Sequence, residues 1–207
     1  MLAREVIDVA APSSEVFHGL SNVEMRCSWA EEVPESYAEY HDREWGVEVR
    51  DDRALYERIC LEGFQAGLSW WTILSRREAF RELFANFDPE VVATFSDKEI
   101  AGLRSDDRII RHEGKIRAAI GNAEATLALG VGGLTQLVWS HQPAAQVRPA
   151  SSGQAPTQTP ESIALAKALK AARFTFIGPT TAYALMQACG LVNDHVAGCV
   201  AGDQLGK

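Results

Sequence analysis

Two cysteines and two histidines near opposite ends of the chain have the chemistry to bind one metal ion. Near the C-terminus, "LVNDHVAGC" places His195 and Cys199 four residues apart, on one face if the segment is helical. Near the N-terminus, "RCSWAEEVPESYAEYH" adds Cys27 and His41. Two thiolates and two imidazoles form a closed tetrahedral set that suits structural Zn²⁺. The alternative, which spacing alone favours, is two unrelated pairs.

A glycine turn is the second feature with possible chemistry. The stretch "FTFIGPTTAYALMQACGL" predicts two helices joined by a tight turn at Gly178. Free N–H groups at the second helix start, from Thr180 and Thr181, could hold a DNA phosphate, and the helix dipole favours an anion there. Lys170 and Arg173 lie just upstream and would add positive charge. The alternative is a plain helical hairpin packed in the core, so the turn by itself is weak evidence for DNA.

The elements that must position these residues are all predicted to be helices. Apolar residues recur at helical intervals, and no alternating segment exceeds a few residues, so the predicted fold is all-α. Capping residues at Asp51, Ser96 and Thr159 mark three helix starts. Helices are expected over 51–63, 69–87, 96–103, 109–130, 132–143 and 159–174. The segment 143–160 is rich in Pro, Ser, Gln and Ala and predicts an irregular surface loop.

Composition bounds the class of protein. A chain of 207 residues that is 46% apolar suits one domain, here 25–207, after an N-terminal extension of uncertain order over 1–24. Four cysteines in a chain without a signal-peptide pattern argue for reduced thiols, with Cys60 and Cys189 expected in the core. The longest apolar runs are too short for a membrane span, so we expect a cytoplasmic monomer.

The net charge of −8 argues against a nucleic-acid binder until its distribution is considered. Residues 1–62 contain 15 acidic and six basic side chains, which leaves the remainder close to neutral. Ordinary solvated helix faces explain this pattern, and a DNA-binding face is compatible with it.

Five stretches, taken in order, resemble the 3-methyladenine DNA glycosylase I family. They are "MRCSW", "YAEYHDREWGV", "LYERICLEGFQAGLSW", "IIRHEGKIRAAIGNA" and "FTFIGPTTAYALMQACGLVNDHVAGC", and they run from about Met25 to Cys199. The resemblance implies a helix–hairpin–helix fold, with that motif at about 163–199, and a structural zinc joining the two ends of the chain. It also implies hydrolytic release of 3-methyladenine from double-stranded DNA that contains alkylated bases.

The resemblance assigns roles to individual residues. Glu62 corresponds to the family's base-contacting carboxylate and is our candidate catalytic residue, and the glycine turn corresponds to its DNA-gripping hairpin. The aromatic lining of the base pocket corresponds to Trp29, Tyr37, Tyr40 and Trp70. The zinc ligands correspond to Cys27, His41, His195 and Cys199. Without the resemblance, the aromatics would be read as core and Glu62 as a solvated residue near a helix end.

Comparison with related enzymes bears on the role of Asp194 and on whether a lysine could act as a nucleophile. Many helix–hairpin–helix base-excision enzymes carry an aspartate in V-D-T-H, where this chain has Asn193, and the resembling family lacks that aspartate too. Asp194 comes one residue later, which on a helix turns it about 100° away from the site, so we expect it to be structural. No lysine is placed for Schiff-base chemistry, so we expect no strand-cleaving activity, with Lys115 and Lys170 the residues to test otherwise. Phe64 in "GFQAG" departs from the family pattern and is expected beside the pocket.

Two alternatives belong to other classes. A non-catalytic damage-binding protein would use the same hairpin and pocket to hold DNA, although retention of Glu62 and the aromatics argues against it. A zinc hydrolase would need one of the four ligands displaced by water.

Overall fold

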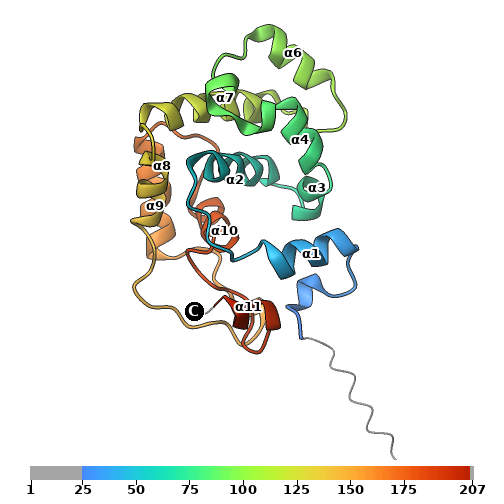
Figure 1. Ribbon diagram of the computed structural model, residues 1–207, viewed down its shortest axis with the longest axis vertical. Helices are drawn as coiled ribbons and strands as arrows, with labels where there is room; N and C mark the ends of the chain where they lie inside the picture. The colour runs from blue at the N-terminus through green and yellow to red at the C-terminus, as the bar shows by residue number, and fades with distance from the viewer. Residues whose placement is uncertain (1–24, 206–207) are drawn as a thin grey trace, which may run out of the picture.

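The computed structural model describes residues 25–205, so the predicted extension over 1–24 lies outside it. Within the described residues all regular elements are helical and no strand is present, which confirms the predicted all-α class (Figure 1). None of these helices is long and apolar enough to cross a membrane. The α-helices are α1 (Glu35–Arg43), α2 (Asp52–Gln65), α3 (Trp70–Leu74), α4 (Arg77–Leu83), α5 (Pro89–Val92), α6 (Asp97–Ser105), α7 (Glu113–Ala128), α8 (Gly133–Trp139), α9 (Pro160–Ala171), α10 (Pro179–Ala188) and α11 (Val200–Gln204). Three short 3₁₀ helices are η1 (Ser28–Ala30), η2 (Ala85–Phe87) and η3 (Ser152–Gln154).

Helix α2 is the centre of the core. It packs against α7, α8, α10 and α3, and Figure 1 shows it between α7 and α10. The predicted cap is present, since the Asp51 carboxylate accepts a hydrogen bond from the N–H of Ala54 at 2.9 Å. Leu55 and Ile59 are fully buried on the core face of α2, each contributing about 1.5–3 kcal/mol through burial of its side chain. The last turn of α2, which carries Glu62, is therefore held on a rigid element.

Helices α9 and α10 pack against each other and are joined by residues 172–178. The predicted start of α9 is confirmed, with Thr159 as N-cap in a capping box and a proline at the first helical position. Within the connection, Phe174 is buried while Phe176 is exposed, and Arg173 and Phe176 both have positive φ (73° and 55°). Positive φ values do not occur within a right-handed α-helix, so the chain cannot continue as one helix here and instead forms a turn.

The single helix predicted over 69–87 is wrong, because the chain breaks there into α3, α4 and η2. The breaks fall at Arg76, whose φ/ψ of −111°/2° is non-helical, and at Phe84, whose φ/ψ is −102°/29°. Tertiary packing overrides the helical pattern here. With the chain turned, Phe80 and Phe84 reach the ring of Phe64, at centroid distances of 4.6 and 5.7 Å.

The predicted helix around His195 and Cys199 is also wrong. Residues 193–199 are irregular, and α11 begins only after Cys199, which is its N-cap. A turn at Gly198, with φ of 88°, reverses the backbone where a helix would have continued. The predicted loop over 143–160 is confirmed apart from η3, and it lies across this irregular segment.

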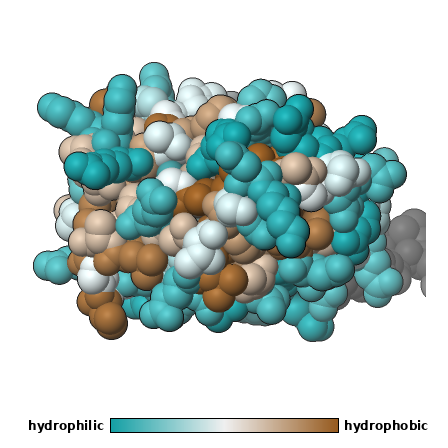
Figure 2. All heavy atoms as spheres, turned by 90° about the horizontal axis from the view of Figure 1, so that it is seen from above, coloured by the Kyte–Doolittle hydropathy of each residue, from teal (hydrophilic) through white to brown (hydrophobic). Residues whose placement is uncertain are grey.

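The face over α6 and α7 is largely hydrophilic when the molecule is viewed from above (Figure 2). Ion pairs join the two helices there, with Arg104 to Glu113 at 2.9 Å and Arg117 to Asp97 at 3.1 Å. Such exposed pairs contribute little stability. This face lies at the opposite end of the molecule from α1 and α11, near which the chemistry-bearing residues gather (Figure 1).

Candidate active site and metal cluster

Cys27, His41, His195 and Cys199 come together in one buried cluster, as the metal prediction required. Their ligand atoms all lie within 4.8 Å of one another. The distances are 3.2 Å from His41 Nε2 to His195 Nδ1, 3.4 Å from Cys199 Sγ to His195 Nδ1, 3.6 Å from Cys199 Sγ to His41 Nε2, and 3.7 Å from Cys27 Sγ to His195 Nδ1. Metal–ligand bonds of about 2.0–2.3 Å in a tetrahedron put neighbouring ligand atoms about 3.3–3.8 Å apart. The four residues could therefore hold a metal ion.

The hydrogen bonds on the outer side of each imidazole orient it for a metal ion. Nδ1 of His41 lies 2.8 Å from the Asp42 carboxylate, and Nε2 of His195 lies 2.9 Å from the carbonyl oxygen of Trp45. Each partner is an acceptor, so these nitrogens carry the protons. The remaining nitrogens then face each other at 3.2 Å with lone pairs and no proton between them. A cation between them resolves this repulsion, which is the outer-shell arrangement usual for metal-bound histidines.

Burial keeps the two imidazoles neutral, which is their ligand form, but it opposes ionisation of the cysteine thiols. Burial lowers the pKa of His195 to about 4 and lowers that of His41, so both rings are neutral at pH 7. Burial raises the pKa of the Cys27 thiol to about 12, opposed by the hydrogen bond that Val196 N–H donates to its sulfur. A thiolate in this position therefore requires a positive ion beside it.

The loop that was predicted only as irregular surface supports the cluster. The Arg148 guanidinium donates hydrogen bonds to three backbone carbonyls of the irregular segment, those of His195, Val196 and Cys199, at 2.6–3.2 Å. It also forms an ion pair with Asp203 of α11. Arg148 thus satisfies backbone carbonyl groups that would accept hydrogen bonds from backbone N–H groups if the segment were helical.

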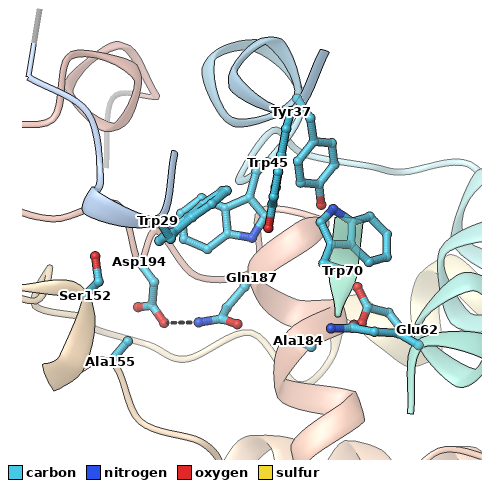
Figure 3. Close-up of a pocket in the computed structure, with 12 residues that line it drawn as sticks. Trp29, Tyr37, Trp45, Glu62, Trp70, Ser152, Ala155, Ala184, Gln187 and Asp194 are labelled. Carbon is cyan, nitrogen blue, oxygen red and sulfur yellow. Dashed lines mark hydrogen bonds between the residues drawn. The ribbon is translucent and has the colours of Figure 1, made fainter. Parts of the chain in front are cut away.

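A pocket of about 250 Å³ lies beside the cluster of two cysteines and two histidines (Figure 3). It is bordered by η1 and α1, the end of α2, the start of α3, α10 and the 140–159 loop. The lining residues are Trp29, Tyr37, Tyr40, Trp45, Glu62, Gln65, Trp70, Ser152, Ala155, Ala184, Gln187 and Asp194. The structure therefore brings together all five residues that the resemblance assigned to a base pocket. The connection to the cluster is direct, because α1 supplies both Tyr40 and His41.

Glu62 is the buried carboxylate of this pocket. Its side chain is only 5% exposed, which contradicts the reading as a solvated residue near a helix end. Burial raises the pKa of Glu62 to about 8, and the positive charge of Arg58 acts in the opposite direction. A carboxylate in this state is poised to accept either a proton or a bound cation.

The aromatic rings around Glu62 form two groups. Tyr40 and Trp70 lie on the Glu62 side, with ring centroids 5.3 Å apart, and Trp29 packs edge-on against Trp45 at 4.9 Å. The indole N–H of Trp70 is buried and has no hydrogen-bond partner. Aromatic faces bind flat, positively charged rings well, and a free N–H offers a bound molecule a donor.

Asp194 lies at the other end of the pocket, so the prediction that it turns away from the site is wrong. The segment is irregular, and the argument from helical rotation does not apply to it. Its carboxylate accepts hydrogen bonds from Tyr183, Gln187 and Gln146 at 2.6–2.8 Å; the bond from Gln187 is dashed in Figure 3. Asn193 is buried and donates to the carbonyl of Gly202 instead. These bonds leave Asp194 well paired, and its structural role stays a prediction.

The residues predicted to grip DNA lie apart from the pocket, at the turn between α9 and α10. Lys170, Arg173 and Gly178 border a groove on this surface, together with Ala66 and residues 174–177. Thr180 and Thr181 lie in the first turn of α10, whose start has no side-chain cap. The N–H groups there are thus available to an anion.

Two expectations about neighbours of Glu62 are changed by the structure. Phe64 does not line the pocket, because it is buried in the core against Phe80 and Phe84. The Nζ of Lys115 donates to the carbonyls of Phe64 and Ala66, at 2.9 and 2.7 Å, and so caps the end of α2. Neither Lys115 nor Lys170 borders the pocket.

Sequence reasoning missed the pocket residues Trp45, Gln65 and Gln187. Trp45 stands in the "YAEYHDREWGV" stretch and Gln65 follows Phe64 in "CLEGFQAGLSW", so both had a signal in the matched motifs. Gln187 stands in the last matched stretch, within "ALMQACGL", but its place in the pocket depends on how α10 packs against α2.

The fold and site define a small helical protein with an aromatic pocket around a buried carboxylate. The sequence pattern of the methyladenine glycosylase family matches residues 29–202. A DNA-3-methyladenine glycosylase 1 from Escherichia coli is 51% identical over 180 residues, which cover 84% of this chain and 95% of that protein. A DNA-3-methyladenine glycosylase from Haemophilus influenzae is 44% identical, over 84% of this chain and 96% of that protein.

Solved structures agree. A crystal structure of 3-methyladenine DNA glycosylase I superposes with a TM-score of 0.81 and 48% identity, covering 85% of this chain and 98% of that one. The enzyme from Staphylococcus aureus, described for its recognition of 3-methyladenine, gives a TM-score of 0.80 at 31% identity, covering 86% and 96%. This chain belongs to the methyladenine glycosylase family.

Proposed function

We propose that the protein is a DNA-3-methyladenine glycosylase, which removes the alkylated base from double-stranded DNA by hydrolysis. The observation that carries the proposal is the Glu62 carboxylate, buried within a pocket of aromatic rings. Methylation at N3 makes adenine a cation, and a pocket with one buried carboxylate and several aromatic faces is suited to a cationic base. Family membership and the two curated relatives support the same activity.

The base must leave the DNA stack before it can reach the pocket. Once inside, it would stack on the aromatic rings near Tyr40 and Trp70, while Glu62 accepts hydrogen bonds from its exocyclic amine. The entering positive charge favours the ionised form of Glu62, so base binding and loss of the Glu62 proton are linked. A neutral base does not attract the Glu62 carboxylate in this way, so the pocket selects cationic bases over neutral ones.

Hydrolysis then breaks the bond between the base and C1′ of the sugar. Water adds to C1′, its proton passes to solvent, and the bonding electrons leave with the base and neutralise its charge. The charged ring is already a good leaving group, so the protein needs only to bind, orient and enclose it. We infer that Glu62 serves chiefly to hold the base in that arrangement.

The α9–α10 pair would act as a helix–hairpin–helix that grips the DNA backbone. The uncapped N–H groups at the start of α10 suit a phosphate, and Lys170 and Arg173 add charge at the same groove. Because this groove is separate from the pocket, DNA affinity and base recognition can be changed independently.

The cluster of Cys27, His41, His195 and Cys199 fits Zn²⁺, which we propose as its resident ion. Two sulfurs and two imidazole nitrogens at tetrahedral spacing match the preferences of that metal. When bound, zinc would contribute a cross-link between the two ends of the domain rather than a catalytic water, because the protein supplies all four ligands. The link stabilises the pocket, since α1 carries both a ligand and an aromatic wall.

We further propose that the enzyme has no strand-cleaving activity, acts as a monomer in the cytoplasm, and forms one domain over 25–207. The engagement of Lys115 with two backbone carbonyls supports the first point, because its amine is not free to attack a sugar.

The alternative of a damage-binding protein without catalysis predicts tight binding to damaged duplex and no released base. Duplex DNA treated with a methylating agent distinguishes the two, with released bases separated by chromatography and untreated duplex as control. We expect 3-methyladenine to be released and 7-methylguanine to stay in the DNA. Folded protein that binds the treated duplex and releases no base would refute the glycosylase.

A further inference from the structure

Arg58 lies one helical turn before Glu62 on α2. Residues four apart on a helix lie on the same face, so the two side chains are neighbours. The Arg58 side chain is only 12% exposed, which is unusual for an arginine and requires its charge to be balanced locally. It also sits against the pocket wall, with its guanidinium carbon 5.9 Å from the centre of the Tyr40 ring.

The hydrogen bonds of Arg58 leave part of its charge unmatched. Its Nη2 donates to Glu44 at 3.0 Å, while its Nη1 is buried and has no partner. Glu44 is shared, since Arg77 donates to both of its carboxylate oxygens at 2.6 and 2.9 Å. Arg77 also lies 4.0 Å from the Glu78 carboxylate, but that group is 81% exposed and solvent screens its charge. Among the buried groups, two guanidinium groups therefore share one carboxylate, and one positive charge remains in excess.

Glu62 is the carboxylate that can balance this excess. With Glu62 ionised, two cations face two anions; with Glu62 protonated, the cluster of Arg58, Arg77 and Glu44 keeps a net positive charge. An uncompensated buried charge is costly, so the cluster opposes the larger effect of burial and eases the ionisation of Glu62. The other groups that act on Glu62 are Tyr40 from α1 and Cys189 at the end of α10, and burial raises the pKa of each, so neither supplies a charge at neutral pH.

We propose that Arg58 is a positioning residue whose positive charge eases the loss of the Glu62 proton, so that Glu62 can become an anion when a cationic base binds. The inference rests on the proposed function, because it is the binding of a cation that requires the anion. Without such a charge, a carboxyl group this deeply buried would lose its proton only at a still higher pH. Arg58 thus sets the lower pH limit of activity without touching the substrate.

The test compares Arg58→Met, which keeps the bulk of the side chain, with Arg58→Lys, which keeps its charge. Arg81→Met is the matched control, because Arg81 is also a partly buried arginine that joins two elements, α4 and α2, through an ion pair with Glu57 at 2.8 Å. Two quantities are measured between pH 5 and 9: the midpoint of the Glu62 carboxyl titration by ¹³C NMR, and kcat/KM for release of 3-methyladenine. Thermal melting verifies that each variant is folded.

We expect Arg58→Met to raise the titration midpoint of Glu62 by about one pH unit and to lower kcat/KM at acidic pH about tenfold. Arg58→Lys and Arg81→Met should leave both close to the wild-type values. An unchanged midpoint in Arg58→Met, or an equal shift in Arg58→Lys, would overturn the proposal. Arg58→Gln, which still donates to Glu44, carries the same expectation if the methionine variant does not fold.

The NMR titration needs no activity, so the two proposals fail separately. A wild-type protein that releases no 3-methyladenine refutes the glycosylase, whatever the midpoint. A wild-type protein that does release it, with a midpoint insensitive to the charge at position 58, refutes only the role of Arg58.

Discussion

Replacement of Glu62 by glutamine should make the protein more stable, and increasingly so as the pH rises. The pKa of Glu62 is about 8 in the folded protein, because the carboxyl group is buried, against an ordinary value of 4.5. Between these values the folded protein holds a proton that the unfolded chain has lost. The free energy of unfolding of the wild type therefore falls as the pH rises from about 4.5 to about 8. Glutamine is neutral throughout and does not contribute this loss.

The size of the effect follows from the two pKa values. At about 1.4 kcal/mol for each unit of pKa, their difference corresponds to roughly 5 kcal/mol as an upper limit. Water entering the open pocket would relieve part of that cost, so we expect about 1–2 kcal/mol at pH 9. In a protein of this size, each kcal/mol changes the melting temperature by about 2–4 °C.

Thermal melting of the wild type and of Glu62→Gln at intervals from pH 5 to pH 9 tests this reasoning. The two should melt at similar temperatures at pH 5, and the variant should melt several degrees higher at pH 9. Glu99→Gln is the control, because hydrogen bonds within its capping box lower the pKa of that exposed carboxyl. Its difference from wild type should stay constant above pH 6. A gap between wild type and Glu62→Gln that does not widen with pH would refute the assignment of a buried, proton-holding carboxylate.

Three further predictions concern the hairpin, the metal and Asp194. Lys170→Ala and Arg173→Ala should each weaken binding to undamaged duplex DNA and lower its salt slope by about one, whereas Lys98→Ala on α6 should change neither; an unchanged slope would exclude these contacts. Chelation of the metal, or Cys199→Ser, should lower the melting temperature by at least about 10 °C, and activity should be lost only as the protein unfolds. Loss of activity in a fully folded protein would contradict a structural role for the ion. Asp194→Asn should cost about 1–3 kcal/mol in the free energy of unfolding, because three donors lose a carboxylate acceptor, while base release by the folded variant falls less than about tenfold. A thousandfold loss of activity in that variant would make Asp194 catalytic.

The helices could be predicted from the sequence where local chemistry determines them. The caps at Asp51, Ser96 and Thr159 all form as expected, because a side chain three or fewer residues from its partner needs no tertiary context. The breaks that separate α3, α4 and η2 could not be predicted. They depend on which phenylalanine rings meet in the core, and those contacts join residues far apart in sequence.

The residues of the site also fall into a predictable group and an unpredictable one. Glu62 and the four aromatics lie in motifs that a family resemblance can identify, and the structure brings them into one pocket. Arg148, whose hydrogen bonds replace those of the expected helix around His195, lies in a loop whose composition predicted only that it is irregular. Its role, and that of Gln187, arise only from long-range packing.

The central claim is that Glu62, within its aromatic pocket, removes 3-methyladenine from DNA. The most direct test is single-turnover release of 3-methyladenine from methylated duplex by the wild type and by Glu62→Gln, with affinity for undamaged duplex measured alongside. The wild type should release the base, and the variant should release it roughly 10- to 100-fold more slowly, because it loses a hydrogen bond to a charged group. Both proteins should bind undamaged DNA equally well. A folded Glu62→Gln protein that releases the base as fast as the wild type would contradict the account.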